Sequence, residues 1–380
     1  MTSTAIPAPF TAPETDRAMF WWLIVVAAFV CSMILVGGAT RLTDSGLSIV
    51  EWRPVTGAIP PLTQQGWEQE LEKYRQIPEY QEQNRGMSMA EFQFIYWWEW
   101  GHRQLGRVLG LVYFLPFVFF LWSGRAPRRL RPRLWILFGL GGLQGAIGWW
   151  MVSSGLVDRL DVSQYRLATH LTMAFIILGL TLWTALELRY GPTRTRHRSR
   201  VFPWAAAFWG AVLFQIALGA FVAGLDAGRI HTTWPGFQGR LIPDDYLMGL
   251  PFWQALFESR PAVQLQHRWF GYALVIAGAV LSVALWRSRD GVLRRYALLM
   301  PAALLAQVAL GIVTLLAAAP LSLSLLHQGG AVALFMIAGA AAWTATRAPG
   351  APADDQPVGA TTARATTSRA TSFTDSSARS

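Results

Sequence analysis

The sequence predicts an all-α membrane protein with eight transmembrane helices, arranged as two four-helix bundles related by a pseudo-twofold axis. Three observations lead to this fold class. The 380 residues are 53% hydrophobic and 14% charged, and their mean hydropathy is +0.32, a balance typical of polytopic membrane proteins. Eight apolar runs are long enough to cross about 30 Å of hydrocarbon. The two halves of the chain also carry similar short motifs in the same order.

The apolar runs define the expected spans, which lie at residues 19–38, 102–123, 133–153, 168–188, 202–223, 264–286, 297–318 and 322–345. Arg-rich segments connect spans two and three, four and five, and six and seven: GRAPRRLRPR, RYGPTRTRHRSR and RSRDGVLRR. By the positive-inside rule, these connections and both termini are cytoplasmic. The loops account for most of the net charge of +10, so this charge indicates membrane topology rather than nucleic-acid binding.

The same features divide the chain into segments. We expect a cytoplasmic N-terminal segment (1–18), a first four-helix unit (19–190), a cytoplasmic linker (191–201), a second four-helix unit (202–346) and a disordered cytoplasmic tail (347–380). The tail is rich in Ala, Thr, Ser and Arg, with almost no large apolar residues. The single cysteine, Cys31, lies within the first span and excludes an intramolecular disulfide.

The internal repeat relates the two units. GGATRLTDSG follows the first span and GAFVAGLDAG the fifth, and this match aligns Gly37, Asp44 and Gly46 with Gly219, Asp226 and Gly228. QGAIG from Gln144 matches QVALG from Gln307, and HRQLG from His102 matches HRWFG from His267. Because both halves have the same orientation, the repeat is parallel, with its axis along the membrane normal.

Four of the six histidines lie at matched depth. They open the even-numbered spans, which all run from outside to inside, and are His102, His170, His267 and His327. Imidazoles are costly in a membrane unless they are paired or ligated, and two facing histidines are a natural axial pair for a haem iron. The repeat pairs them within each unit, which predicts two haem sites in the outer leaflet. His197 and His231 are expected in solvated loops.

The two predicted sites differ beside their first ligand. Glu99 stands one helical turn before His102, whereas Gln264 stands in the same place before His267. A carboxylate can exchange protons or stabilise a developing cation, while an amide can only hydrogen-bond. The N-terminal site is therefore predicted to carry out chemistry, and the C-terminal site to hold a haem that passes electrons.

Arginines lie next to the predicted ligands. Arg103 and Arg268 directly follow His102 and His267, and Arg107 lies one turn deeper. Bidentate pairing with anionic haem propionates is the expected role. The alternatives are snorkelling to lipid phosphate and, for Arg103 or Arg107, an interfacial ion pair with Glu99.

Two long outer loops follow the first and fifth spans, from about Thr40 to Trp98 and from about Leu225 to Val263. Loops of this length are usually functional, and their aromatic and Pro-rich segments are expected to cover the haem sites. In the first loop, TQQGWEQELEKYRQ predicts a short surface helix that ends before Pro78.

Several of these segments together resemble the haem A synthase family, across residues 19–345: GGATRLTDSGLSIVEWRPVTGAIPPL, EFQFIYWWEWGHRQLGR, the TWP…G…IP element of the second outer loop and the four placed histidines. The resemblance implies oxidation of the C8 methyl group of haem O to a formyl group, by successive hydroxylations and loss of water, giving haem A for cytochrome c oxidase. It implies a bacterial inner-membrane protein that works beside the haem O-making prenyltransferase and cytochrome oxidase assembly factors.

Residue roles also follow from the resemblance. His102 and His170 would hold the substrate haem O, with Arg103 and Arg107 nearby and Glu99 as the functional carboxylate. His267 and His327, with Arg268, would hold a haem b cofactor that handles electrons. Some family members carry a cysteine pair in the first outer loop, and this chain has none there. A route for electrons through such a disulfide is therefore absent.

Other functions explain parts of the pattern. A di-haem b-type electron-transfer cytochrome linked to quinone accounts for the four histidines but not for the carboxylate at only one site. A polyprenyl transferase needs paired Asp-rich motifs to hold magnesium diphosphate, and Asp244 and Asp245 stand in a loop without a third Asp four residues from the first. A transporter would use the intramembrane histidines in a proton or metal path.

Overall fold

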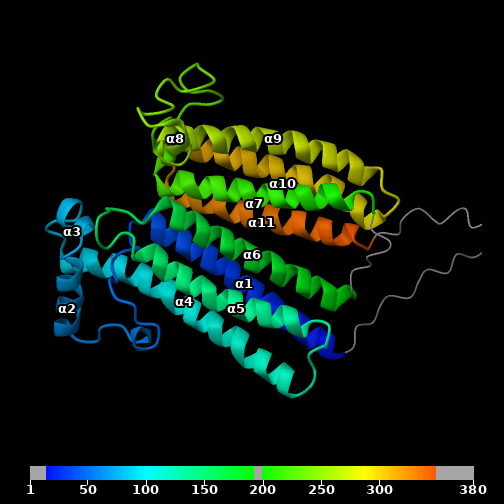
Figure 1. Ribbon diagram of the computed structural model, residues 1–380, viewed down its shortest axis with the longest axis horizontal. Coiled ribbons are helices and arrows are strands. Elements are labelled where there is room, and N and C mark those ends of the chain that lie inside the picture. The colour runs from blue at the N-terminus through cyan, green and yellow to red at the C-terminus, as the bar shows by residue number, and fades with distance from the viewer. Residues whose placement is uncertain (1–13, 192–198, 348–380) are drawn as a thin grey trace, which may run out of the picture.

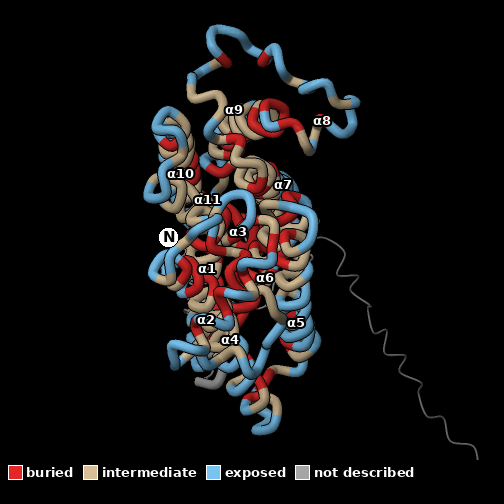
Figure 2. Tube along the Cα trace, turned by 90° about the vertical axis from the view of Figure 1, so that its left-hand side faces the viewer, coloured by how far each residue is buried: buried red, intermediate tan, exposed pale blue. Residues whose placement is uncertain are grey.

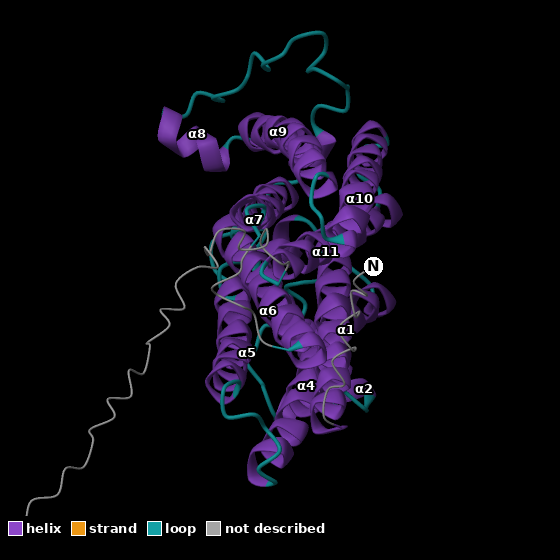
Figure 3. Ribbon diagram, turned by 90° about the vertical axis from the view of Figure 1, so that its right-hand side faces the viewer, coloured by secondary structure: helices purple, strands orange, loops and turns teal. Residues whose placement is uncertain are grey.

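The computed structural model describes residues 14–191 and 199–347. The predicted disorder of the tail, most of the N-terminal segment and linker, and the prediction for His197 fall outside these residues. Within the described residues the chain is helical, with one isolated β-bridge between Phe237 and Arg240 (Figures 1 and 3). Eight helices are long and apolar enough to cross a membrane, which confirms an all-α membrane protein with eight candidate spans.

The long helices correspond to the eight predicted spans. They are α1 (Glu14–Leu42), α4 (Met89–Trp122), α5 (Arg131–Val152), α6 (Gln164–Tyr190), α7 (Phe202–Gly224), α9 (Arg260–Trp286), α10 (Gly291–Leu316) and α11 (Leu321–Ala345). Short helices occupy the loops: η1 (Thr56–Ala58), α2 (Gln64–Tyr74), α3 (Pro78–Glu82), η3 (Ala227–Arg229) and α8 (Phe252–Glu258).

Helix α4 begins at Met89, well before the boundary predicted at residue 102. Ser88 caps it: the Ser88 hydroxyl accepts from the Glu91 N–H, and the Glu91 carboxylate accepts from the Ser88 N–H. This capping box starts the helix in the outer loop, and the helix continues through the aromatic segment that precedes the span. His102 therefore lies inside a continuous helix that begins in the outer loop.

The long helices pack as two closed rings. In the first ring, α1 contacts α4 and α6, and α5 contacts the same two helices; in the second, α7 contacts α9 and α11, and α10 contacts these two. The rings meet through α1 and α6 on one side and α7 and α11 on the other (Figure 1). Neighbours follow the same chain order in both rings, as expected for a duplicated unit, while the pseudo-twofold axis itself stays a prediction.

The main hydrophobic core runs through both rings and their interface, where buried residues concentrate (Figure 2). At that interface, Gly179 of α6 and Gly339 of α11 both face Trp209 of α7. A Cβ at either glycine would lie within 2.7 or 2.9 Å of the indole. The missing side chains therefore let three helices from two units close around one tryptophan.

Both long loops lie at the same end of the rings, and the Arg-rich connections between α4 and α5 and between α9 and α10 lie at the other (Figure 1). The predicted surface helix is α2, which Thr63 caps by accepting a hydrogen bond from the Gly66 N–H at 3.1 Å. Trp67 and Tyr74 of α2 pack with Phe92 and Tyr96 of α4 in a second core cluster. The first loop is thus anchored to the extended part of α4.

The repeat is visible where the first helix of each unit ends. Asp44 and Asp226, which the sequence aligns, both have a left-handed backbone with φ of 49°. Arg41 donates hydrogen bonds to Asp44 and Asp226, at 2.9 Å each, and lies 3.4 Å from Asp161. One largely buried arginine therefore ties the outer loops of the two units together.

Candidate haem-binding sites

The C-terminal unit brings two predicted ligands face to face. His267 of α9 and His327 of α11 have ring centroids 6.4 Å apart and planes at 82°. Imidazole nitrogens bind metals at about 2 Å, so two rings on opposite sides of one metal have centroids roughly 6 Å apart. The spacing of these rings fits a single metal atom between them.

The N-terminal unit holds the other two ligands in the equivalent helices. His102 lies on α4 and His170 on α6, close enough for their imidazoles to interact electrostatically. Each of the four imidazoles also packs against a glycine of a neighbouring helix, where an added Cβ would come within 2.9–3.1 Å of the ring; these glycines are Gly37, Gly148, Gly219 and Gly311.

The ligand number suits haem. In the part of the chain that the structure describes, no group of three or more His, Cys, Asp or Glu residues is placed to hold a metal ion. Protein zinc sites use three or four side-chain ligands, whereas a haem iron takes four nitrogens from its macrocycle and two axial ligands from the protein. A pair of facing imidazoles can therefore supply both axial ligands of a haem iron, and it is fewer side chains than protein zinc sites use.

Glutamines hold three of the four imidazoles. The Nε2 groups of Gln144, Gln215 and Gln307 lie 3.2, 3.1 and 3.2 Å from the Nδ1 atoms of His170, His267 and His327. Each amide also donates to the main-chain carbonyl of the same histidine, at 3.0, 2.9 and 2.9 Å. Sequence reasoning used Gln144 and Gln307 only to mark the repeat. It missed Gln215, although QIALG shares their spacing of glutamine and glycine.

Glu99 is 2% exposed and accepts four hydrogen bonds. One carboxylate oxygen accepts from the Ser48 hydroxyl at 2.7 Å and from the Ile49 N–H at 2.8 Å. The other accepts from Nε and Nη2 of Arg103, at 3.1 and 2.6 Å. The ion pair weighed from the sequence is therefore present, and its partner is Arg103. Sequence reasoning missed the loop residues, because nothing local links residue 48 to residue 99.

The predicted propionate-binding arginines also hold the outer loop. Arg103 donates to the carbonyls of Ile49 and Glu51, at 2.7 and 3.0 Å. Arg107 donates to the carbonyls of Arg53 and Pro54, at 2.9 Å each. The first loop is thereby fastened over α4 at successive turns, next to the His102 position.

The C-terminal unit repeats this design with an amide in place of the carboxylate. Gln264, also 2% exposed, donates to the His231 carbonyl at 3.1 Å, while its own Oε1 is buried with no partner among the described residues. Arg268 donates to the carbonyls of His231 and Thr233, at 2.6 and 2.9 Å. The predicted contrast between Glu99 and Gln264 is thus a contrast between an ion-paired anchor and a neutral one. His231, expected to be solvated, lies in this anchor.

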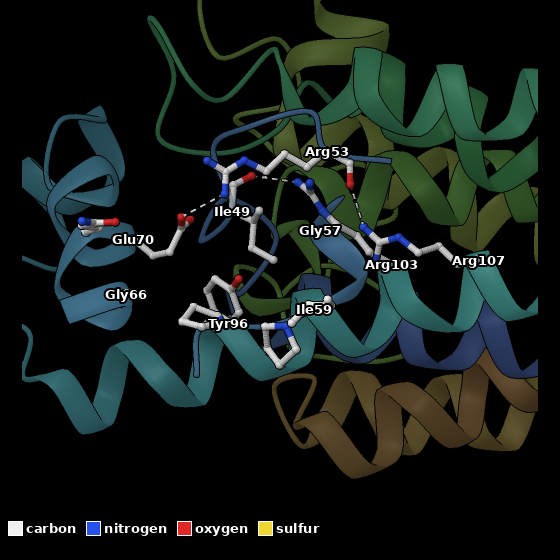
Figure 4. Close-up of a pocket in the computed structure, with 12 residues that line it drawn as sticks. Ile49, Arg53, Gly57, Ile59, Gly66, Glu70, Tyr96, Arg103 and Arg107 are labelled. Atoms are coloured by element: carbon white, nitrogen blue, oxygen red, sulfur yellow. Dashed lines mark hydrogen bonds and ion pairs between the residues drawn. The ribbon is translucent and has the colours of Figure 1, made fainter. Parts of the chain in front are cut away.

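A pocket of about 210 Å³ lies between the first outer loop, α2 and α4 (Figure 4). Arg103 and Arg107 line one side, and Arg53 and Glu70, 3.3 Å apart, line the other. The lining combines these charged side chains with apolar ones, among them Ile59 and Pro60, and it includes Arg103 and Ile49, which also contact Glu99. It offers arginine side chains to an acidic group near the N-terminal site.

Comparison with known proteins identifies the family. A model of the family described as cytochrome oxidase assembly protein matches residues 20–338. Among the relatives, a protein of Maricaulis maris named Heme A synthase is 58% identical over 340 residues, 90% of this chain and 99% of its own length. Proteins with the same name from Bradyrhizobium diazoefficiens and Caulobacter vibrioides are 49% and 48% identical, over 88% and 89% of this chain and 92% and 99% of their lengths. With this agreement across nearly all of its described residues, the chain belongs to the haem A synthase family.

Proposed function

We propose that this protein is a haem A synthase: an oxidoreductase that converts the C8 methyl group of haem O to a formyl group, by successive hydroxylations and loss of water. The observation that carries the proposal is a pair of matching two-imidazole sites, of which only the N-terminal one has a buried carboxylate beside its first ligand. The family membership favours the synthase over the di-haem electron-transfer cytochrome, since its relatives are named for haem A synthesis.

In this proposal the N-terminal unit holds the substrate. His102 and His170 bind the iron of haem O, and Arg103 and Arg107, which line the pocket beside the first outer loop, pair with its propionates. Glu99 is the functional carboxylate. Four donated hydrogen bonds fix its position, so it presents negative charge at one defined place beside the substrate, without the cost of rearranging during the reaction.

The C-terminal unit would hold a haem b cofactor through His267 and His327, with Arg268 beside them. When bound, haem b supplies one-electron transfer. The residues of this unit keep the cofactor rigid: two glutamines orient the imidazoles, and Gln264 provides no charge that would take part in proton transfer.

The proposed setting is the bacterial cytoplasmic membrane, with both termini in the cytoplasm and the haem sites toward the outer leaflet. The Arg-rich connections at one end of the rings and the long loops at the other support this orientation (Figure 1). Proposed partners are the prenyltransferase that makes haem O and cytochrome oxidase assembly factors, which would receive the product.

The test is to express the protein in a membrane that supplies haem O, purify it, extract its haems, separate them and measure their masses. Haem A together with haem b supports a substrate site and a cofactor site. Haem b alone, at two per chain, favours an electron-transfer cytochrome. His102→Ala and His267→Ala are matched variants: the first is expected to abolish haem A while keeping haem b, and the second to remove haem b.

A further inference from the structure

Three of the four imidazoles share one anchoring arrangement. In each case a glutamine stands four residues before the glycine that faces the ring: Gln144 before Gly148, Gln215 before Gly219, and Gln307 before Gly311. Four residues are about one helical turn, so the glutamine and the glycine lie on one face of the helix. The glycine makes room for the ring, and the amide holds it.

Met33 occupies this place for the fourth imidazole, since it stands four residues before Gly37, which faces His102. The side-chain positions also match in space. The Met33 methyl lies 3.5 Å from where a Cβ of Gly106 would be, and Gln215 Nε2 lies 3.4 Å from the same point at Gly271. Gly106 and Gly271 each follow their histidine by four residues. Met33 is therefore the counterpart of Gln215.

The His102 ring differs from the other three in both contacts and orientation. No hydrogen bond reaches its imidazole from any residue that the structure describes. Its Nε2 is the atom nearest Gly37, at 3.0 Å from the added Cβ. The other three rings present Cε1 to their glycines, at 2.9, 3.1 and 2.9 Å, with Nδ1 as the next atom. The ring without a glutamine therefore presents a different edge to its glycine than the other three rings do.

The difference matters for metal binding. When Nε2 of a histidine binds a metal, Nδ1 carries a proton, and a partner for that proton fixes the ring and strengthens the ligand. Each of the three glutamines places its amide group 3.1–3.2 Å from Nδ1 and holds it there by donating to the carbonyl of the same histidine. A thioether sulfur is only a weak acceptor, so Met33 offers His102 much less.

We propose that Met33 makes His102 the exchangeable ligand of the substrate site, which lets haem O enter and haem A leave while the glutamine-held ligands stay fixed. The proposal rests on the function proposed above, because only a substrate haem has to be exchanged. A cofactor haem held by two anchored imidazoles stays bound through many turnovers. Met33 is thus a positioning residue: it leaves the His102 imidazole without the amide contact that the glutamines give to the other three imidazoles.

The test is the rate at which haem leaves the purified protein. Protein loaded with haem O is mixed with excess apomyoglobin, which captures free haem, and the haem O and haem b left on the protein are separated over time. We expect Met33→Gln to slow haem O release about tenfold, the effect of one added hydrogen bond, with haem b release unchanged. Met33→Leu, which adds no hydrogen bond, is the matched control and should release haem O at the unsubstituted rate.

Release of haem O from Met33→Gln at the unsubstituted rate would overturn the proposal. If that variant fails to retain haem b and so has not folded, the mirror variant Gln215→Met decides: haem b release about tenfold faster supports the proposal, and an unchanged rate refutes it. The rates of haem O and haem b release do not depend on whether the protein oxidises haem O. A protein that exchanges haem O as expected but makes no haem A would refute the proposed function. It would still support the proposed difference between His102 and the three imidazoles that glutamines hold.

Discussion

Replacing Glu99 by glutamine separates its charge from its shape. The variant Glu99→Gln gives the N-terminal site the amide that the C-terminal site has at Gln264. The single oxygen of the new amide still accepts from Arg103, but its NH₂ group now faces the Ile49 N–H. In the unsubstituted protein this N–H donates to the Glu99 carboxylate at 2.8 Å. Two donors then meet in a position that is 2% exposed, and the Ile49 N–H loses its acceptor.

The expected magnitude follows from that lost contact. A hydrogen bond to a charged group contributes about 1.5–3 kcal/mol, and each 1.4 kcal/mol is a factor of about ten in an equilibrium constant. Local opening of the loop around Ser48 and Ile49 should become roughly ten to a hundred times more frequent. Arg103 keeps its bonds to the Ile49 and Glu51 carbonyls, so the loop is loosened but not released.

Hydrogen exchange read by mass spectrometry on the peptide containing Ser48 and Ile49 measures this opening, and haem extraction from the same sample measures haem A. We expect faster exchange, no haem A and unchanged haem b. Ser48→Ala is the matched control, because it removes one donor and keeps the carboxylate; it should exchange faster but still make haem A. Unchanged exchange in Glu99→Gln would refute the anchoring role. Haem A made by that variant would remove the Glu99 charge from the reaction.

Three further outcomes are expected. His327→Ala should lose haem b and its visible absorbance, because it removes one of the two facing imidazoles, whose ring centroids are 6.4 Å apart. Full haem b content would show that the pairing with His267 is wrong. Gly311→Ala should lower haem b content, since the new Cβ would lie 2.9 Å from the His327 ring and a contact this short forces the ring to shift; haem content at the unsubstituted level would contradict it. In the outer loop, burial raises the pKa of Glu79 to about 8, although Tyr74 donates to it. The folded state then binds a proton that an unfolded glutamate, with a pKa of about 4.3, gives up, so stability should fall as pH rises from about 4.5 to 8. Thermal unfolding midpoints across that range should fall less for Glu79→Gln than for the unsubstituted chain, and equal slopes would refute a neutral buried Glu79.

The membrane fold could be predicted from composition alone, because a helix that crosses hydrocarbon needs a run of apolar residues that is easily counted. The four histidines and the Glu99 and Gln264 contrast were equally accessible, since an internal repeat compares each residue with its counterpart in the same chain. The start of α4 was harder to predict, because its capping box lies in a polar loop far from the apolar run that defines the span.

The sequence by itself determined which residue types are available: eight candidate spans, four imidazoles on the long apolar helices and one carboxylate, Glu99, that has an amide as its counterpart. Only the tertiary structure decided what these residues contact. Ser48 and Ile49 reach Glu99 across fifty residues of chain, and Met33 faces the His102 helix where glutamines face the other histidines. Such contacts join different helices and loops, so they depend on how the rings close. Spacing along the chain specifies which residues share one face of a helix, but not which neighbour that face meets.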